Sequence, residues 1–504
     1  MQFNYGPVQY ERGRFVCTDD ADFSGYNAGM NSDRHSLQTL PAQRIDERGK
    51  PHVDINAVFA LVLPLIANSS IQIALNLTDT WFVGRISTNA LAGMAAIHWL
   101  VVVVIGVFGG VGMAVQTVAA QAQGGRRYKR AAQSAWTSLW AALFTLPLFV
   151  LIAFSCAHFL DLFQLRPDIN ELAMQFWRPR MLGAALAIAL WGVLGFFNGI
   201  GRPRTTLVIN LITLTINAVL AQLFIFKLHL GIAGAAWATN CATLMGLLIA
   251  ISVFLFSDAC HKYGSRLMWR LNARRLYEQF KLGLPMGLML AADLFGFALF
   301  QLMIVKFSAV DGAATQIAMM LTSLAYMPGV GIALAGTTLV GQAIGAGDKA
   351  WARKLGNFII TMAMIYMGTI GILLGIAGPW LLPLFITSQD VMAANVVHVG
   401  SVILWLAAIY QVFDAMSLGS SFCLRGAGDA TVPAILVTSC SWLIFVPLTY
   451  MLSFQPGQGW VNWLPQFGLG AIGGWSAAVI YICLIGSIML LRWRSKAWER
   501  MVIR

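Results

Sequence analysis

Three aspartates lie inside long apolar stretches of the sequence, where charged residues are otherwise scarce. They are Asp79, Asp293 and Asp414, whereas the other 18 of the 21 acidic residues fall in tails, loops or segment ends. An ionised carboxylate at the centre of a membrane helix costs about 2.5 to 3.5 kcal/mol on insertion scales. No Lys or Arg is expected at comparable depth, so each carboxylate must bind a cation or a proton, unless it only hydrogen-bonds a neighbouring helix. The three acids therefore predict an ion-coupling site.

Polar neighbours of the first aspartate extend this candidate site. Asn76 and Thr80 place further oxygens near the end of the first apolar segment, and Asn76 and Asp79 share one helix face by their i,i+3 spacing. His98, inside the second segment, has the side chain best suited to relay protons near neutral pH. A hydrogen-bonded packing histidine is the alternative for His98, and the sequence leaves both roles open.

The two later aspartates are predicted to act together. Tyr410 and Asp414 are four residues apart, so a helix points the phenol and the carboxylate the same way. With Asp293 they form a set of oxygen ligands suited to Na⁺. Two neighbouring carboxylates would equally share one proton, because their mutual repulsion favours protonation of one of them. The sequence leaves H⁺ and Na⁺ open as coupling ions.

The composition explains why these few charges stand out. Of 504 residues, 58% are hydrophobic and only 11% are charged, with a formal net charge of +12. Soluble proteins carry about 25% charged residues. The chain is therefore predicted to be a polytopic membrane protein, and disordered, collagen-like, disulfide-scaffold and nucleic-acid-binding classes are excluded. Seven scattered cysteines without CxxC spacing indicate neither a zinc site nor a disulfide framework, and no cofactor is expected.

Twelve apolar segments are expected to hold these residues in place as transmembrane helices, each long enough to cross about 30 Å of hydrocarbon. They are predicted at 57–83, 91–115, 131–157, 173–199, 204–228, 231–257, 280–306, 312–339, 356–386, 396–424, 431–454 and 469–493. Most Lys and Arg, including Arg425, are assigned to loops on one side, whereas Arg178 and Arg180 are assigned to the other. By the positive-inside rule both termini are cytoplasmic.

An internal repeat divides the twelve helices into two halves of six. Pro64 and Gln121 recur as Pro285 and Gln342, in both cases 221 residues later. An even number of crossings per half gives parallel topology, so two six-helix bundles are expected, related by a pseudo-two-fold axis along the membrane normal. Residues 1–54 are predicted to be a cytoplasmic polar tail that is mostly disordered or loosely helical. The first lobe is predicted at 55–257, a cytoplasmic linker at 258–279, the second lobe at 280–495 and a cytoplasmic tail at 496–504.

Several motifs together resemble those of one transporter family. NLTDTWFVGRIST in the first segment, GFFNGIGRPR at the end of the fourth, GLPMGLMLAAD in the seventh and YQVFDAMSLGSSFCLRGAGD in the tenth are similar to motifs of the multidrug and toxic compound extrusion (MATE) family, in its bacterial NorM-like branch. The resemblance covers about residues 55–495. It implies an all-α carrier of a bacterial inner membrane that exports amphipathic, often cationic compounds, driven by a cation and working by alternating access of two lobes.

The resemblance also implies roles for individual residues. Asp79 matches the acid that the family protonates, and Asp414 with Tyr410 matches its C-terminal cation site. Asp293 stands where that branch commonly has Glu, and its shorter side chain leaves the coupling ion open. Asn217 matches a family Asn, but four residues later an alanine stands where relatives carry a polar or acidic residue. Proton exchange at Asp79 is therefore expected in place of a complete Na⁺ site in the first lobe.

The predicted function is a secondary antiporter that exchanges H⁺ or Na⁺ for amphipathic, cationic drugs or toxic compounds. The chain is expected to act as a monomer surrounded by membrane lipid. A flippase or exporter of lipid-linked or polysaccharide precursors is the alternative, but such proteins tend to line their transport path with Arg or Lys, and none is expected mid-membrane here. An intramembrane enzyme is not expected, because no HExxH, GxSxG or GxGD motif lies in mid-segment.

Overall fold

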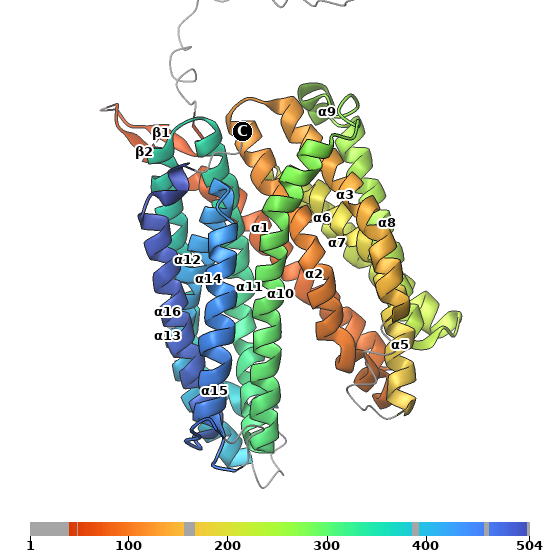
Figure 1. Cartoon of the computed structure of the whole chain (residues 1–504), viewed down its shortest axis with the longest axis vertical. Helices are drawn as coiled ribbons and strands as arrows, with labels where there is room; N and C mark the ends of the chain where they lie inside the picture. The colour runs from red at the N-terminus through yellow and green to blue at the C-terminus, as the bar shows by residue number, and fades with distance from the viewer. Residues whose placement is uncertain (1–39, 48, 156–166, 386–392, 458–462, 501–504) are drawn as a thin grey trace, which may run out of the picture. The chain divides into compact units, whose positions relative to one another are not determined.

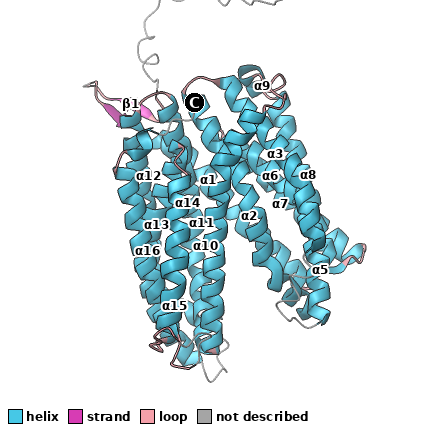
Figure 2. Ribbon diagram, in the orientation of Figure 1, coloured by secondary structure: helices cyan, strands magenta, loops and turns pink. Residues whose placement is uncertain are grey.

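The described structure is almost entirely helical (Figure 2). A computed structural model describes residues 40–155 except 48, and residues 167–385, 393–457 and 463–500, so most of the predicted N-terminal tail lies outside the described residues. Long apolar sequences form helices because hydrocarbon offers the backbone no hydrogen-bond partners, whereas a helix satisfies its own. The elements in chain order are β1 (Gln43–Ile45), β2 (Pro51–Val53), α1 (Ile55–Gly84), α2 (Thr88–Gly124), α3 (Tyr128–Ser155), α5 (Pro167–Leu182), α6 (Ala184–Gly199), α7 (Pro203–Gln222), η3 (Leu223–Lys227), α8 (Gly231–Phe256), α9 (Asp258–Tyr263), α10 (Ala273–Phe307), α11 (Ala309–Gly345), α12 (Lys349–Leu381), η4 (Leu382–Phe385), α13 (Ala393–Ala427), α14 (Thr431–Cys440), η5 (Ser441–Phe445), α15 (Val446–Ser453), α16 (Gly470–Arg494) and η6 (Ala497–Arg500).

The helices provide the twelve crossings that the sequence predicts. In the described part of the chain, 11 helical segments are long and apolar enough to span a membrane, and α5 with α6 makes a twelfth that is bent by 45°. The bend lies at Gly183, where a Cβ atom would lie 2.1 Å from the side chain of Asn240 in α8. That amide donates a hydrogen bond of 2.5 Å to the carbonyl oxygen of Pro179. Helix α8 therefore packs closely against the break and satisfies a backbone group there.

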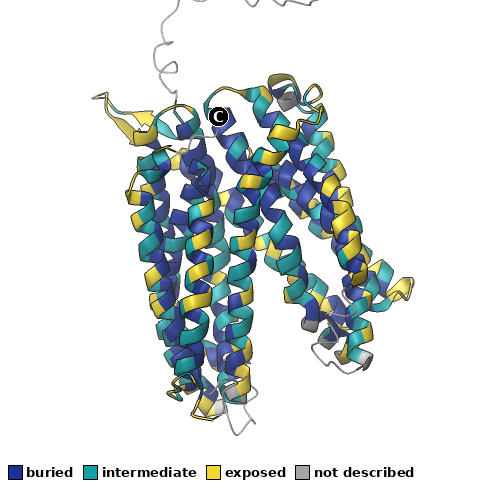
Figure 3. Cartoon of the chain, in the orientation of Figure 1, coloured by how far each residue is buried: buried dark blue, intermediate teal, exposed yellow. Residues whose placement is uncertain are grey.

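The two large hydrophobic cores of the described residues correspond to the two halves of the chain, and the residues coloured as buried gather where helices meet (Figure 3). Helix α1 departs from the predicted division, because four residues between 58 and 65 belong to the core of the second half. The contact is close: a Cβ atom on Gly331 of α11 would lie 2.6 Å from the backbone of Ile66. Since α1 also contacts α7, the first helix bridges both halves.

Residues 40–47 and 49–53 form a hairpin, which the prediction of a mostly disordered or loosely helical tail did not include. Strands β1 and β2 pair in antiparallel fashion beside the start of α12 (Figure 1). Nε1 of Trp351 donates to the carbonyl oxygen of Pro41 at 2.9 Å, and Nζ of Lys354 donates to that of Pro51 at 2.7 Å. Helix α12 holds the hairpin through backbone carbonyls, which the polar composition of this stretch does not reveal.

The described end of the C-terminal tail packs against the same helix. Trp498 is buried, and its ring stacks on that of Trp493 with centroids 4.7 Å apart. Nε1 of Trp493 donates to Oδ1 of Asn357 in α12 at 2.9 Å. Arg353, also in α12, forms an ion pair with Glu499. The first turns of α12 thus receive both ends of the described chain.

The two halves meet through α2, α10 and α11. At the C-terminal ends of α2 and α11, glycines permit a reciprocal approach of the backbones. A Cβ atom on Gly124 would lie 1.8 Å from the carbonyl oxygen of Gln342, and one on Gly345 would lie 2.0 Å from that of Gln121. These four residues, here called the clasp, are related by the repeat of 221 residues. The ribbons of α2 and α10 lie together near this end and separate toward the other (Figure 1).

The glutamines of the clasp add reciprocal hydrogen bonds between the halves. Nε2 of Gln121 donates to the carbonyl oxygen of Gly426 at 2.9 Å. Nε2 of Gln342 donates to that of Gly199 at 2.8 Å. Each acceptor lies at the end of a helix in the opposite half, α13 or α6. The internal repeat is therefore expressed as a symmetric contact at one end of the helices.

Candidate ion-coupling sites

Asp79 in α1 begins a short chain of polar side chains in the first half, here called the N-terminal cluster. The hydroxyl of Thr239 in α8 donates to Oδ2 of Asp79 at 3.2 Å, and Nδ2 of Asn217 in α7 donates to that hydroxyl at 3.2 Å. The other carboxylate oxygen, Oδ1, is buried and has no hydrogen-bond partner among the described residues. The structure thus connects Asp79 and Asn217 through Thr239, which the sequence analysis missed.

A positive charge also belongs to this cluster, which contradicts the expectation that no Lys or Arg lies at comparable depth. Arg180 lies in α5, and its Nη1 donates to Oδ1 of Asn240 at 3.4 Å. It interacts electrostatically with both Asp79 and His98. The predicted segment 173–199 already contained Arg180 but placed it near its start; α5 begins six residues earlier, at Pro167, so Arg180 lies further inside the span than predicted.

The other predicted partners of Asp79 lie apart from this chain of hydrogen bonds. Asn76 and Thr80 are exposed, and the Thr80 hydroxyl donates to the carbonyl oxygen of Asn76 at 2.8 Å. An i,i+3 spacing is therefore insufficient to bring Asn76 to the cluster. His98 in α2 is half-buried, with its ring centroid 5.7 Å from that of Trp99.

Asp293 in α10 and Asp414 in α13 form a second group, here called the C-terminal cluster. They lie close enough to interact electrostatically, and Tyr410 interacts with both, so the three predicted residues come together. Asp414 is 8% exposed, and within the described part of the chain its Oδ2 has no hydrogen-bond partner. The hydroxyl of Tyr481 in α16, which sequence reasoning missed, donates to Oδ1 of Asp293 at 3.4 Å.

Two more missed residues complete the C-terminal cluster. Tyr326 in α11 interacts electrostatically with both aspartates, and Arg425 in α13 interacts with Asp293. The Arg425 side chain is buried, and its guanidinium lies 4.5 Å from the centroid of the Phe422 ring. Its prediction as a loop residue is wrong, because α13 continues to Ala427.

The two clusters have the chemistry of cation or proton binding. Each contains a buried carboxylate oxygen without a partner among the described residues, and a proton or a cation would neutralise its charge. Each also contains an arginine, which repels a further cation. No group of three His, Cys, Asp or Glu side chains that could hold a metal ion occurs within the residues described.

The comparisons with known proteins place this arrangement in a family. The MatE family model matches residues 64–223 and 285–451, one match in each half. The chain belongs to the MatE family. Members of this family are transporters, so the protein is an integral membrane transporter and not an enzyme. The family predicted from the motifs is thereby confirmed.

Similar proteins cover most of the chain. It is 27% identical over 412 residues to the probable multidrug resistance protein NorM of Agrobacterium fabrum, covering 80% of this chain and 88% of that protein. The identity to the protein of the same name from Pseudomonas putida is 29% over 425 residues, covering 82% and 90%. A solved structure described as an outward-facing conformation of a multidrug resistance MATE family transporter of the MOP superfamily superimposes with a TM-score of 0.76 at 20% identity, covering 88% and 96%. The predicted fold is confirmed.

Proposed function

We propose that this MatE transporter exports amphipathic, cationic compounds, including drugs, from a bacterial cell in exchange for protons. The observation that carries the proposal is a buried carboxylate oxygen without a partner among the described residues in each half, on Asp79 and on Asp414. Because an unpaired buried charge is costly, each acid gains from binding a proton or a positively charged substrate. The similarity to probable multidrug resistance proteins supports drugs as substrates.

Competition between the proton and the substrate would drive export. An ionised Asp79 or Asp414 attracts a cationic compound, and protonation from outside removes that attraction. Because the coupling is reciprocal, a bound substrate equally lowers the affinity for the proton. A coupling free energy of about 1 to 3 kcal/mol is sufficient for such exchange.

Thr239 is suited to follow the protonation of Asp79. Its hydroxyl has one proton but two available acceptors, Oδ2 of Asp79 at 3.2 Å and the carbonyl oxygen of Ala235 at 3.0 Å. When Asp79 is ionised, the hydroxyl donates to the carboxylate. When Asp79 is protonated, the acid donates to Thr239, and the hydroxyl donates to Ala235. Asn217 donates to Thr239 in both states, so the rearrangement leaves this hydroxyl fully hydrogen-bonded.

The number of oxygen ligands favours protons over Na⁺ as the coupling ion. Arg180 near Asp79 and Arg425 near Asp293 each supply a fixed positive charge, which opposes the binding of a proton and of Na⁺ alike. A proton needs only one oxygen, and the unpartnered carboxylate oxygens of Asp79 and Asp414 each provide one. Metal cations bound through oxygen take several such ligands together, and Asp79 is the single acid of the N-terminal cluster.

The clasp and the proposed topology support alternating access as the mechanism. The distribution of Lys and Arg favours cytoplasmic termini, and the clasp lies at the end of α2 and α11 that the termini share (Figure 1). A closed clasp would block the cytoplasmic side, and its opening would expose both clusters to the cytoplasm. The similarity to an outward-facing MATE structure supports this orientation.

Export of lipid-linked or polysaccharide precursors fits the polar groups less well. Arg180 and Arg425 do supply positive charges within the helices, which the sequence analysis did not expect. Both have polar neighbours of their own, however: Arg180 donates to Asn240, and Arg425 interacts with Asp293. An anionic headgroup would have to displace these partners.

Everted membrane vesicles test the proposal, because their lumen corresponds to the cell exterior. Vesicles containing the full chain should accumulate ethidium when the lumen is acidic, and not when only a Na⁺ gradient is imposed. The double variant Asp79→Asn/Asp414→Asn, present in equal amount, should show no gradient-driven uptake. Uptake driven only by Na⁺ would overturn proton coupling, and uptake by the double variant at the wild-type rate would overturn the role of the two acids.

A further inference from the structure

Residues 264–272, here called the linker segment, lie alongside α3 between α9 and α10. Two tryptophans of α3 hold its backbone. Nε1 of Trp136 donates to the carbonyl oxygen of Ser265 at 2.6 Å, and Nε1 of Trp140 donates to that of Trp269 at 2.8 Å. The linker segment therefore runs along α3, because two of its residues that are four apart bind two tryptophans that are also four apart in the helix.

The attachment points indicate the depth of the linker segment in a bilayer. Helix α3 has 28 residues and is about 42 Å long, which exceeds the hydrocarbon thickness of about 30 Å. Its first turn carries Lys129 and Arg130, so the excess lies at this end. Trp136 and Trp140 follow within the next three turns, and tryptophans concentrate at the boundary of headgroups and hydrocarbon. The linker segment is thus held at the level of the headgroups.

The linker segment exposes both apolar and basic side chains. Leu267 is 70% exposed, Trp269 is 52% exposed and Leu271 is 46% exposed. Arg266 precedes Leu267 and Arg270 lies between Trp269 and Leu271, and both arginines are exposed as well. Apolar side chains on a water-exposed loop are unfavourable, whereas at a membrane surface they enter the boundary region and the arginines remain with the headgroups.

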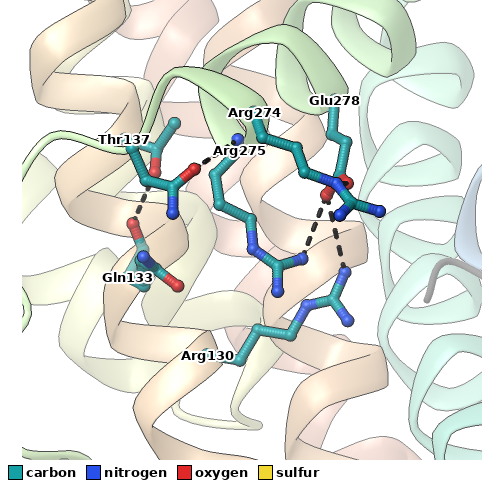
Figure 4. A network of polar contacts seen from close by, with 7 residues as sticks. Arg130, Gln133, Thr137, Arg274, Arg275 and Glu278 are labelled. Atoms are coloured by element: carbon teal, nitrogen blue, oxygen red, sulfur yellow. Dashed lines mark hydrogen bonds and ion pairs between the residues drawn. The ribbon is translucent and has the colours of Figure 1, made fainter.

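The surroundings are strongly positive. Between residues 262 and 281 there are six Lys and Arg and a single acid, Glu278. Glu278 lies 4.0 Å from Arg130, 3.2 Å from Arg274 and 3.0 Å from Arg275, so three guanidinium groups share one carboxylate (Figure 4). The local excess of positive charge attracts anions, and clusters of four to eight basic residues beside a membrane helix are typical of anionic-lipid binding.

We propose that the linker segment binds anionic phospholipid headgroups at the membrane surface, with Leu267, Trp269 and Leu271 inserted at the boundary between headgroups and acyl chains. A bilayer satisfies the apolar and the basic side chains together, at the depth where Trp136 and Trp140 hold the backbone. An acidic soluble partner would match the charges alone and would leave the apolar side chains without a suitable environment. This binding goes beyond the proposed antiport and does not depend on it.

Hydrogen–deuterium exchange of the full chain in nanodiscs tests the proposal. One set of nanodiscs contains only phosphatidylcholine, and the other contains one quarter phosphatidylglycerol. We expect exchange of peptides covering 264–272 to be roughly tenfold slower with phosphatidylglycerol. Each basic residue contributes a roughly fivefold preference for an anionic surface, so Arg270→Gln/Arg274→Gln should remove most of this difference.

Two control variants separate charge from insertion and from folding. Lys349→Gln/Lys496→Gln removes the same charge from exposed positions in the second half and should keep the lipid-dependent protection. Trp269→Ser should raise exchange of the segment in both lipids and leave that of α3 unchanged. Equal exchange in the two nanodiscs, or lipid-dependent protection that persists in Arg270→Gln/Arg274→Gln, would overturn the proposal. Ethidium uptake by the same variants reports separately on transport.

Discussion

The N-terminal and C-terminal clusters occupy corresponding halves of a repeated fold but differ in composition. The N-terminal cluster has one acid, Asp79, which accepts from the hydroxyl of Thr239, and that hydroxyl accepts from the amide of Asn217. The C-terminal cluster has two acids, and its neutral partners are tyrosines. The clasp, in contrast, is nearly identical in the two halves, with Gly124 and Gly345 in equivalent contacts. The repeat therefore preserves the contact that joins the halves and allows the two ion-coupling clusters to diverge.

The difference has a chemical consequence. Asp79, the single acid near Arg180, is either ionised or protonated. In the proposed exchange, the Thr239 hydroxyl donates to Asp79 in the first state and to Ala235 in the second. Two interacting acids titrate as a pair, and the first proton is shared because their charges repel. The C-terminal cluster is thus expected to respond more strongly to neutralisation of one acid.

The largest expected effect is that of Asp414→Asn. The substitution removes the acid with an unpartnered oxygen and leaves Asp293, whose charge is already balanced by Arg425 and hydrogen-bonded by Tyr481. Gradient-driven ethidium efflux should fall to the level of cells without the transporter. Efflux rates from cells with matched amounts of membrane protein measure this. Glu171→Gln, which neutralises an exposed carboxylate, is the control and should transport normally. Normal efflux by Asp414→Asn would mean that the C-terminal cluster is not the coupling site.

The acids of both clusters were predictable from the sequence, whereas most of their partners were not. A carboxylate in an apolar segment can be recognised from the sequence without knowing which helices pack together, so Asp79, Asp293 and Asp414 were predicted as site residues. Thr239 and Tyr481 carry no such signal, because a hydroxyl is common in membrane helices. Their roles arise from which faces of α1, α8, α10 and α16 meet.

Arg425 was missed for a different reason. Predicted segments were cut to the thickness of the hydrocarbon, but α13 has 35 residues, about 52 Å, and continues past Arg425. The repeat contained a usable signal, since the motif FNGIG (197–201) aligns with LRGAG (424–428) and pairs Arg425 with the buried Asn198. The fold itself followed from apolar length and the repeat, both of which depend only on local composition.

The clasp offers the next largest effect, and here the halves should respond alike. Gly124→Ala and Gly345→Ala each place a Cβ atom within about 2 Å of a backbone carbonyl oxygen in the other half. Such overpacking costs about 1 to 3 kcal/mol, so each substitution should lower efflux roughly tenfold or more by opposing closure. Gly84→Ala is the matched control, because its nearest neighbour would be 3.9 Å away. Efflux that falls in only one of the two variants would show that the contact is not functionally symmetric.

Replacement of Arg180 should weaken transport through the N-terminal cluster alone. Arg180→Gln removes the positive charge that interacts with Asp79 and the charged donor to Asn240. An uncharged side chain replaces neither interaction in full, so efflux should fall roughly tenfold. Efflux rates from cells with matched amounts of membrane protein measure this. Arg178→Gln, on an exposed position of the same helix, should transport normally. Normal efflux by Arg180→Gln would assign Arg180 to packing alone.

The smallest expected effect separates the hydroxyl partners of the two clusters. Thr239→Val keeps the shape of the side chain but removes the donor to Asp79 and the acceptor for Asn217. At about 1 kcal/mol for a hydrogen bond, efflux should fall roughly fivefold, and Thr239→Ser should restore it. Tyr481→Phe removes one bond of 3.4 Å to Asp293, an acid that Arg425 also supports, so its loss should be nearer twofold. A larger loss in Tyr481→Phe than in Thr239→Val would reverse the order and make the C-terminal cluster the one that depends on its hydroxyl.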